Sequence, residues 1–196
     1  MSRFGPSGTL PGEVASRKPS LRLIEPEPSE AEAGPLDLEE AFARFAPYVA
    51  SIGLRILGRR DEVDDLVQDV FLLAAKGLDT VRDPRATRAW LATVTVRTAR
   101  KKLRRRRWKM ILSLDEAADY EDLTDRSASP EVRAMLKTVY RELDRMGADE
   151  RIAWTLRYIE GEKLERIALL CGCSLATAKR RIGRAHDAIQ KAVGDG

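Results

Sequence analysis

The sequence predicts an all-α protein of two small helical domains joined by an acidic linker. Three observations support this fold class. From Leu38 onward, apolar residues recur three and four positions apart, which is the period of a helix, and no stretch alternates as a strand does. A segment crowded with Asp and Glu, without apolar periodicity, interrupts this pattern after residue 112. The length of 196 residues is enough for two small domains.

Composition sets the expected domain boundaries. Residues 1–36 are rich in Pro, Gly, Ser and Glu and lack periodic apolar positions, so we predict a disordered N-terminal tail. We assign residues 37–112 to the first helical domain and residues 113–129 to the acidic linker. The second helical domain then spans residues 130–196.

Three helices are expected in the first domain. The first helix has an apolar stripe at Leu38, Phe42, Phe45, Val49, Ile52 and Ile56. Pro47 either kinks this helix or divides it, and Gly58 ends it. A second helix is expected from about Asp61 to Lys76. Asp83 as N-cap, with Pro84 at the first helical position, starts the third.

The second domain begins with two helices. Ser129 and Pro130 start the first of these, and Asp149 opens the next. The apolar stripe of the first is expected at Val132, Met135, Val139, Leu143 and Met146.

The most informative segment runs from Lys163 to Val193. A short helix is followed by the turn 171–173, of sequence Cys-Gly-Cys, and then by Ser174 as the cap of a basic amphipathic helix. This arrangement predicts a helix-turn-helix, whose second helix enters the DNA major groove. An ordinary amphipathic helix with a solvated basic face is the alternative. Because the cap, the turn and the apolar stripe agree, the DNA-binding interpretation is favoured.

The third helix of the first domain ends in a strongly basic run. Eight of the ten residues from Arg100 to Lys109 are basic, which favours a polyanionic partner. Trp90 and Trp108 flank the run, and aromatic rings can stack on exposed bases. For Trp90 a core position is the competing interpretation. For Trp108 the sequence favours neither.

Acidic residues gather on the second helix, beside the basic run. Asp61, Glu62 and Asp64 suit the positive end of the helix dipole, but Asp69 lies more than a turn further in. The residues alone leave two interpretations open, namely helix electrostatics and a docking face for a basic protein surface.

Two motifs in this chain resemble bacterial RNA polymerase sigma factors. The segment 64–71, of sequence DDLVQDVF, resembles the signature of sigma region 2, and Ala89-Trp90-Leu91 resembles the next part of that region. The segments 158–161 and 167–181 are similar to sigma region 4. Because only regions 2 and 4 are present, the layout resembles the extracytoplasmic-function (ECF) group.

The resemblance implies a binding mechanism with core RNA polymerase (the β′ clamp helices and the β subunit) and promoter DNA as partners. The implied polymerase-binding residues are Asp65, Gln68 and Asp69. The implied contacts to the −10 element are Arg82, Arg85, Arg88, Arg97, Arg100, Lys101 and Arg104. Those to the −35 element are Ser174, Thr177, Lys179, Arg180, Arg181 and Arg184. Such a protein recruits polymerase to a promoter and helps open the duplex by capturing unpaired bases.

The chain departs from the family pattern where it would meet the −10 strand. Arg97 stands where the family commonly has Asn, and Lys101 where it often has Asp or Asn. An unusual −10 preference, or a greater share of phosphate contacts, is therefore expected.

Other function classes find little support. A Cys-x-Cys pair with His186 as the only further soft ligand cannot make a four-ligand zinc site, so Cys171 and Cys173 are interpreted as small buried residues, and no metal or cofactor is expected. No catalytic motif appears, so we expect no enzyme. With few cysteines and no stretch of about 20 apolar residues, a cytoplasmic, membrane-free protein is expected. The alternative to a sigma factor is a stand-alone helix-turn-helix regulator. Such a regulator usually dimerises, whereas we expect a monomer, with an anti-sigma factor as a candidate regulator.

Overall fold

A computed structural model describes residues 37–81, 83–112, 120 and 128–194. The predicted tail (1–36), Arg82 and most of the predicted linker lie outside the described residues. The elements are α1 (Leu38–Leu57), α2 (Val63–Gly77), the 3-10 turns η1 (Leu78–Thr80) and η2 (Pro84–Ala86), α3 (Thr87–Ile111), α4 (Pro130–Arg145), α5 (Ala148–Tyr158), α6 (Leu164–Cys171) and α7 (Leu175–Gly194). These residues form no strand, which confirms the all-α prediction. Among the described helices, none is both long and apolar enough to cross a membrane.

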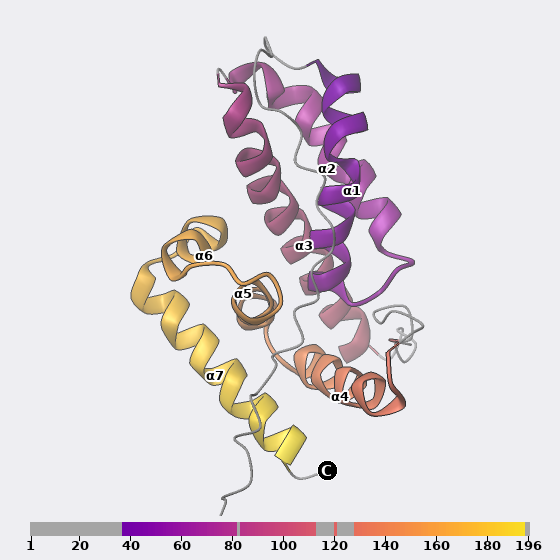
Figure 1. The fold of residues 1–196 in the computed structure, drawn as a ribbon, viewed down its shortest axis with the longest axis vertical. Helices are drawn as coiled ribbons and strands as arrows, with labels where there is room; N and C mark the ends of the chain where they lie inside the picture. The colour runs from indigo at the N-terminus through magenta and orange to yellow at the C-terminus, as the bar shows by residue number, and fades with distance from the viewer. Residues whose placement is uncertain (1–36, 82, 113–119, 121–127, 195–196) are drawn as a thin grey trace, which may run out of the picture. The chain divides into compact units, whose positions relative to one another are not determined.

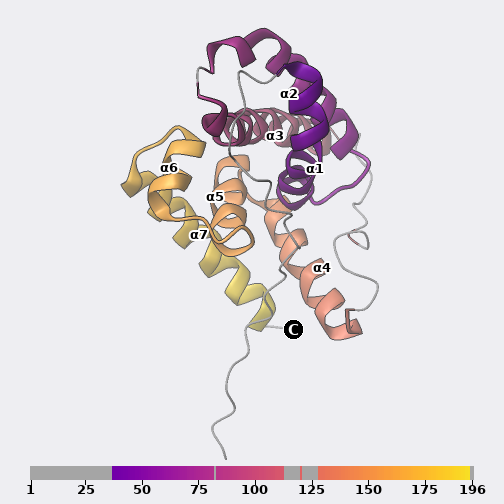
Figure 2. The ribbon, with the colours of Figure 1, turned by 45° about the horizontal axis from the view of Figure 1, so that its top comes forward.

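Helices α1, α2 and α3 lie side by side and form the N-terminal bundle (Figures 1 and 2). Pro47 does not divide the first helix, since α1 runs unbroken from its Asp37 cap to Gly58. The second helix was predicted from about Asp61, and α2 begins two residues later, at Val63, with Glu62 as its N-cap. Val63 N–H instead donates to the carbonyl of Arg60, which closes a turn before the helix.

The predicted start of the third helix proved to be a short 3-10 turn. The Asp83 carboxylate accepts a hydrogen bond from Arg85 N–H at 2.9 Å, which caps η2, and η2 leads directly into α3. A proline at the first position suits either kind of helix, because both leave that N–H without a partner.

Helices α4 to α7 form the C-terminal bundle. Helix α4 starts at Pro130, as predicted, and Ser129 caps it by accepting a hydrogen bond from Val132 N–H. The predicted stripe of α4 was wrong in its first half, because the Val132 and Met135 side chains are exposed. Packing against the rest of this bundle begins only at Leu136 and continues through Val139 and Leu143. The predicted helical period of the apolar residues was correct. The first turns of α4, however, extend beyond the helices that bury its later turns.

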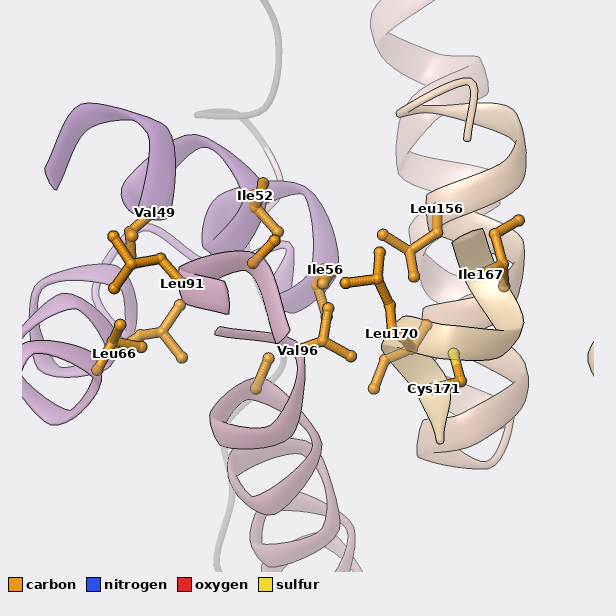
Figure 3. Packing of buried hydrophobic residues seen from close by; sticks show 14 of the residues in the cluster. Val49, Ile52, Ile56, Leu66, Leu91, Val96, Leu156, Ile167, Leu170 and Cys171 are labelled. Atoms are coloured by element: carbon orange, nitrogen blue, oxygen red, sulfur yellow. The ribbon is translucent and has the colours of Figure 1, made fainter. Parts of the chain in front are cut away.

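One apolar core runs through both bundles. Figure 3 shows Ile56 of α1 and Val96 of α3 facing Leu156 of α5 and Leu170 of α6. Burial of such side chains supplies the main favourable term in folding, at about 25 cal/mol per Å² of apolar surface. The helices that carry the two sequence motifs therefore share one core within the described residues.

Side chains of the C-terminal bundle complete the end of α1. The last carbonyls of a helix have no partner within it. Arg151, only 1% exposed, donates to the carbonyls of Ile56 and Leu57, both at 2.7 Å. The Tyr140 hydroxyl donates to the Arg55 carbonyl at 2.8 Å, and burial raises its pKa to about 12.

The charge of Arg151 is balanced by Asp144, whose carboxylate is also held by Arg106. Arg151 pairs with Asp144 through Nη1, and Arg106 reaches the same carboxylate oxygen at 2.8 Å. Arg106 adds a hydrogen bond to the Leu57 carbonyl at 3.1 Å. Burial lowers the pKa of Arg151 to about 10, so the guanidinium remains charged at neutral pH.

Gly58 allows this close approach. It has a φ of 70°, in the left-handed region that favours glycine. A Cβ at this position would lie 2.6 Å from the Tyr140 ring and 2.8 Å from the Arg151 guanidinium. The glycine is therefore required both by the turn and by the packing of the two bundles.

We predict that Arg151→Met lowers the free energy of unfolding by about 3–5 kcal/mol, because it leaves the Ile56 carbonyl without a donor, removes one of the two donors to the Leu57 carbonyl and takes a buried cation away from Asp144. Urea unfolding followed by far-UV circular dichroism measures the change. The matched control is Arg145→Met, which removes an exposed i,i+3 pair with Glu142 and should cost no more than about 1 kcal/mol. Equal effects of the two substitutions would contradict the proposed role of the buried network.

Candidate nucleic-acid and protein interfaces

The predicted helix-turn-helix is formed by α6 and α7. Helix α6 ends at Gly172, which has a φ of 61°. The Ser174 hydroxyl accepts a hydrogen bond from Thr177 N–H at 3.2 Å and so caps α7, as predicted. The buried stripe of α7 consists of Ala178, Ile182, Ala185 and Ile189. These contacts fix one face of the helix on its own bundle and leave the opposite face in solvent.

The predicted −35 residues fall into three sets in the structure. Lys179, Arg180 and Arg184 are exposed on α7. Arg181 is partly buried and forms an ion pair with Asp149 at 3.2 Å. Ser174, besides capping α7, donates its hydroxyl hydrogen to the Thr177 hydroxyl at 2.9 Å.

Helix α3 has a buried side and an opposite face that is basic and aromatic. Leu91, Ala92, Val96, Ala99 and Leu103 form the buried side. Arg97, Lys101, Arg104 and Trp108 are exposed and spaced four, three and four residues apart, which places them on one helix face. Trp108 is 68% exposed, so it is no core residue, whereas the partly buried Trp90 packs against the core.

Of the other predicted −10 residues, Arg85 and Arg88 lie near the start of α3, the partly buried Arg100 lies in its middle, and Arg82 is outside the described residues. Arg85 in η2 is exposed. Arg88, also exposed, places its guanidinium 4.4 Å from the centre of the Tyr48 ring, a cation–π contact.

The positive charge of the basic run does not have to be neutralised by an outside polyanion alone. Carboxylates of the chain itself neutralise part of it, which sequence analysis missed. Arg106 is 6% exposed and pairs with Asp144, so it is unable to reach DNA. Lys102 lies 3.1 Å from Asp69, and Arg100 lies 2.7 Å from Asp149.

The acidic residues on α2 lie beside exposed leucines. Asp65, Gln68 and Asp69 are all exposed and share one face of the helix. Leu72 is 59% exposed and Leu73 is also exposed, one turn further along. Helix electrostatics alone would not place leucines in solvent, so this combination is typical of a surface that binds another protein. Leu72 and Leu73 do not belong to the buried stripe of α2. Their positions outside this apolar period are the sequence feature that could have predicted their exposure.

Comparisons with known proteins assign each of the two bundles to a protein family. Residues 41–109 match the family Sigma-70 region 2, and residues 136–188 match the family Sigma-70, region 4. The ECF RNA polymerase sigma-E factor of Escherichia coli K12 is 30% identical over 159 residues, covering 76% of this chain and 83% of that protein. The chain belongs to the ECF sigma factors.

Other similar proteins agree with this assignment. The RNA polymerase sigma-H factor of Pseudomonas aeruginosa is 33% identical over 160 residues, covering 76% of this sigma factor and 82% of that one. The sigma factor RpoE of Bartonella quintana, solved with the anti-sigma factor NepR, has a TM-score of 0.61 at 23% identity and covers 81% of this chain and 97% of its own. CnrH, solved with the cytosolic domain of CnrY, has a TM-score of 0.52 at 23% identity, covering 81% and 88%. The two structures show a shared fold.

This sigma factor binds core RNA polymerase and directs it to promoters, where transcription is initiated. The interpretation as a stand-alone regulator is not favoured, because both sigma regions are present. The N-terminal bundle matches region 2, and the C-terminal bundle matches region 4. Sigma factors are regulatory proteins that act by binding.

The two cysteines lie at the turn of the sigma factor's helix-turn-helix. Cys171 is buried, and Cys173 is partly buried against the same core. Burial raises the pKa of the Cys171 thiol to about 11, so its reactive thiolate is scarce at neutral pH. Within the described residues, no group of three or more His, Cys, Asp and Glu side chains could hold a metal.

We predict that iodoacetamide at pH 7.5 alkylates Cys173 well before Cys171 in the folded protein, because only Cys173 reaches solvent. Mass spectrometry of tryptic peptides from Cys171→Ser and Cys173→Ser variants assigns the sites. In urea the two rates should become similar. Faster reaction at Cys171 in the folded chain would contradict its place in the core.

Proposed function

We propose that this sigma factor docks on the β′ clamp helices of core polymerase through an acidic face of α2. The docking residues are Asp65, Gln68 and Asp69, and Leu72 and Leu73 extend the contact. The observation that supports this most is that carboxylates and large apolar side chains are exposed together on one short helix. Acidic groups orient the helix on a basic partner surface, and the two leucines, once they are covered by the partner, supply the apolar part of the affinity.

The exposed face of α3 binds the −10 element in this proposal. Arg97, Lys101 and Arg104 contact phosphates along the strand, and Trp108 stacks on an unpaired base at the end of the same face. Arg85, Arg88 and Arg100 complete the basic surface, and Arg82, which lies outside the described residues, is a further proposed contact to the −10 element. Capture of flipped bases offsets the cost of opening the duplex. Because Arg97 and Lys101 are cations where the family commonly has smaller polar or acidic residues, phosphate contacts carry a larger share of the binding here.

Helix α7 reads the −35 element. Lys179, Arg180 and Arg184 reach the major groove, where arginine can recognise guanine edges. Arg181 contributes once it is released from Asp149. Ser174 and Thr177 lie at the N-terminus of α7, where hydroxyl and backbone N–H groups can contact a phosphate. The exposed cations opposite a buried stripe support this role.

The remaining features of the proposal follow from the family. The protein works without a catalytic site or cofactor, as a monomer when free, in the cytoplasm where core polymerase acts. Its second polymerase contact is the β subunit. An anti-sigma factor that covers the α2 face or the DNA-binding faces is a further partner, and the similar sigma factor RpoE of Bartonella quintana was solved with the anti-sigma factor NepR.

Reversing the acidic face should abolish polymerase binding. We expect Asp65→Lys with Asp69→Lys to prevent co-elution with sigma-free core polymerase in size exclusion, while the native chain co-elutes, because like charges would meet at a basic surface. The control is Asp79→Lys with Asp187→Lys, which makes the same charge change at exposed positions outside the proposed interface.

The two double variants separate charge from position. The control variant should still co-elute with the core enzyme. Failure of both double variants would show only a general charge effect, and co-elution of the α2 variant would contradict the docking proposal.

Removing an exposed cation from α7 should weaken DNA binding. We expect Arg180→Ala to reduce affinity for duplex DNA by about 1–3 kcal/mol and to make the salt dependence shallower by about one phosphate contact. Fluorescence anisotropy across a range of salt concentrations measures both. Lys191→Ala, at an exposed basic position in the last turn of α7, is the control and should change little. Equal losses in the two variants would contradict the assignment of the recognition face.

A further inference from the structure

One carboxylate contacts arginines from both bundles. Asp149, at the start of α5, lies 2.7 Å from Arg100 and 3.3 Å from Arg104, both on α3. The same side chain lies 3.2 Å from Arg181 on α7. A single negative charge is therefore shared by three guanidinium groups, two from the N-terminal bundle and one from the recognition helix.

These arginines are the ones that a phosphate backbone would need. Arg100 and Arg104 belong to the proposed −10 surface, and Arg181 belongs to the proposed −35 surface. Arg104 and Arg181 each donate a hydrogen bond to Asp149, which leaves them fewer N–H groups for phosphate. The carboxylate also lowers the positive potential around all three guanidinium groups, including that of Arg100, which it meets as an ion pair. Asp149 thus competes with DNA for both surfaces at once.

The contacts around Asp149 belong to a larger set that holds the bundles together. Arg100 also donates to the Cys171 carbonyl at 2.8 Å. Arg55 at the end of α1 pairs with Glu160 at 2.7 Å, and Tyr140 caps the same helix end. Loosening this set would free the arginines from the carboxylate.

We propose that Asp149 is a positioning residue that restrains the DNA-binding arginines of both bundles, so that the free sigma factor in this arrangement contains its own competitor for the phosphate backbone. The inference rests on the proposed function, which assigns α3 and α7 to DNA. DNA binding exchanges one protein carboxylate for several phosphates, and the bundles loosen as the arginines turn outward.

The first test compares the full-length native chain with Asp149→Asn on a fluorescent duplex of random sequence. We expect this substitution, which replaces the carboxylate by a neutral amide, to tighten binding about five- to tenfold at low salt and to steepen the salt dependence by about one phosphate contact. Asp149→Glu should restore native affinity and salt dependence. A merely structural role predicts the opposite sign, since a damaged fold binds DNA less well.

The matched control is Glu150→Gln, which removes the same charge one residue away. Glu150 pairs with Arg184 at 3.7 Å, a looser contact to a single arginine, so its substitution should change affinity less than twofold. Equal tightening by the two variants would overturn the inference in favour of a general charge effect. Unchanged or weaker binding by Asp149→Asn, with a native circular dichroism spectrum, would overturn it as well.

A second variant keeps the test decisive if Asp149→Asn does not fold. Tyr140→Phe removes one hydrogen bond between the bundles, to the Arg55 carbonyl, and changes no charge. We expect two- to threefold tighter DNA binding, because the restrained arrangement becomes less stable. No tightening would overturn the inference.

Arg180→Ala, run in the same series, tells the two proposals apart. If Arg180→Ala weakens DNA binding while neither Asp149→Asn nor Tyr140→Phe tightens it, the inference fails and the proposed function stands. If Arg180→Ala leaves binding unchanged, the proposed recognition face is itself wrong.

Discussion

The buried charge network at the C-terminal end of α1 is the constraint on which the arrangement of helices depends. The last carbonyls of that helix point into the protein, where water is excluded and an unpaired acceptor is costly. Arg151 supplies donors in a fixed planar fork, which the single ammonium group of a lysine would not reproduce. Asp144 then balances Arg151 and Arg106, with Glu62 at 3.4 Å from Arg106 as the second carboxylate. Two cations and two anions are brought together from α3, α4, α5 and the turn before α2.

Periodicity and capping predicted most of the helices, because both are properties of neighbouring residues. The cap at Ser174 and the helix start at Ser129-Pro130 formed as expected. The exposed Val132 and Met135 show the limit of this reasoning: a period of 3.6 identifies a face but not how far the partner helix extends along it. The start of α2 was predicted only to within two residues, since acidic residues suit a turn and a first helical turn equally well.

The candidate surfaces were only partly predictable for a related reason. Charge counted along the chain makes Arg104 and Arg106 look equivalent, although one is exposed and the other buried. What separates them is Asp144, which is distant in sequence and reaches Arg106 only in the folded chain. Asp149 likewise resembles an ordinary acid in a first helical turn. Its pairing with arginines of two other helices is a tertiary property, and no local pattern encodes it.

In the proposed function, the basic run of α3 therefore serves two purposes, divided by the direction in which each side chain points. Arg106 faces inward, and its pairing is too buried for a phosphate to replace without unpairing Asp144. Lys101 and Trp108 face outward and are available to nucleic acid. Arg104 is exposed and Arg100 lies at the boundary of the buried side, and their ion pairs to Asp149 are partly solvated. Such pairs are worth little more than about 1 kcal/mol. A phosphate backbone, which offers many negative charges and releases counterions on binding, can displace contacts of that strength. The same helix can thus stabilise the fold through its inner arginine and exchange partners through its outer ones.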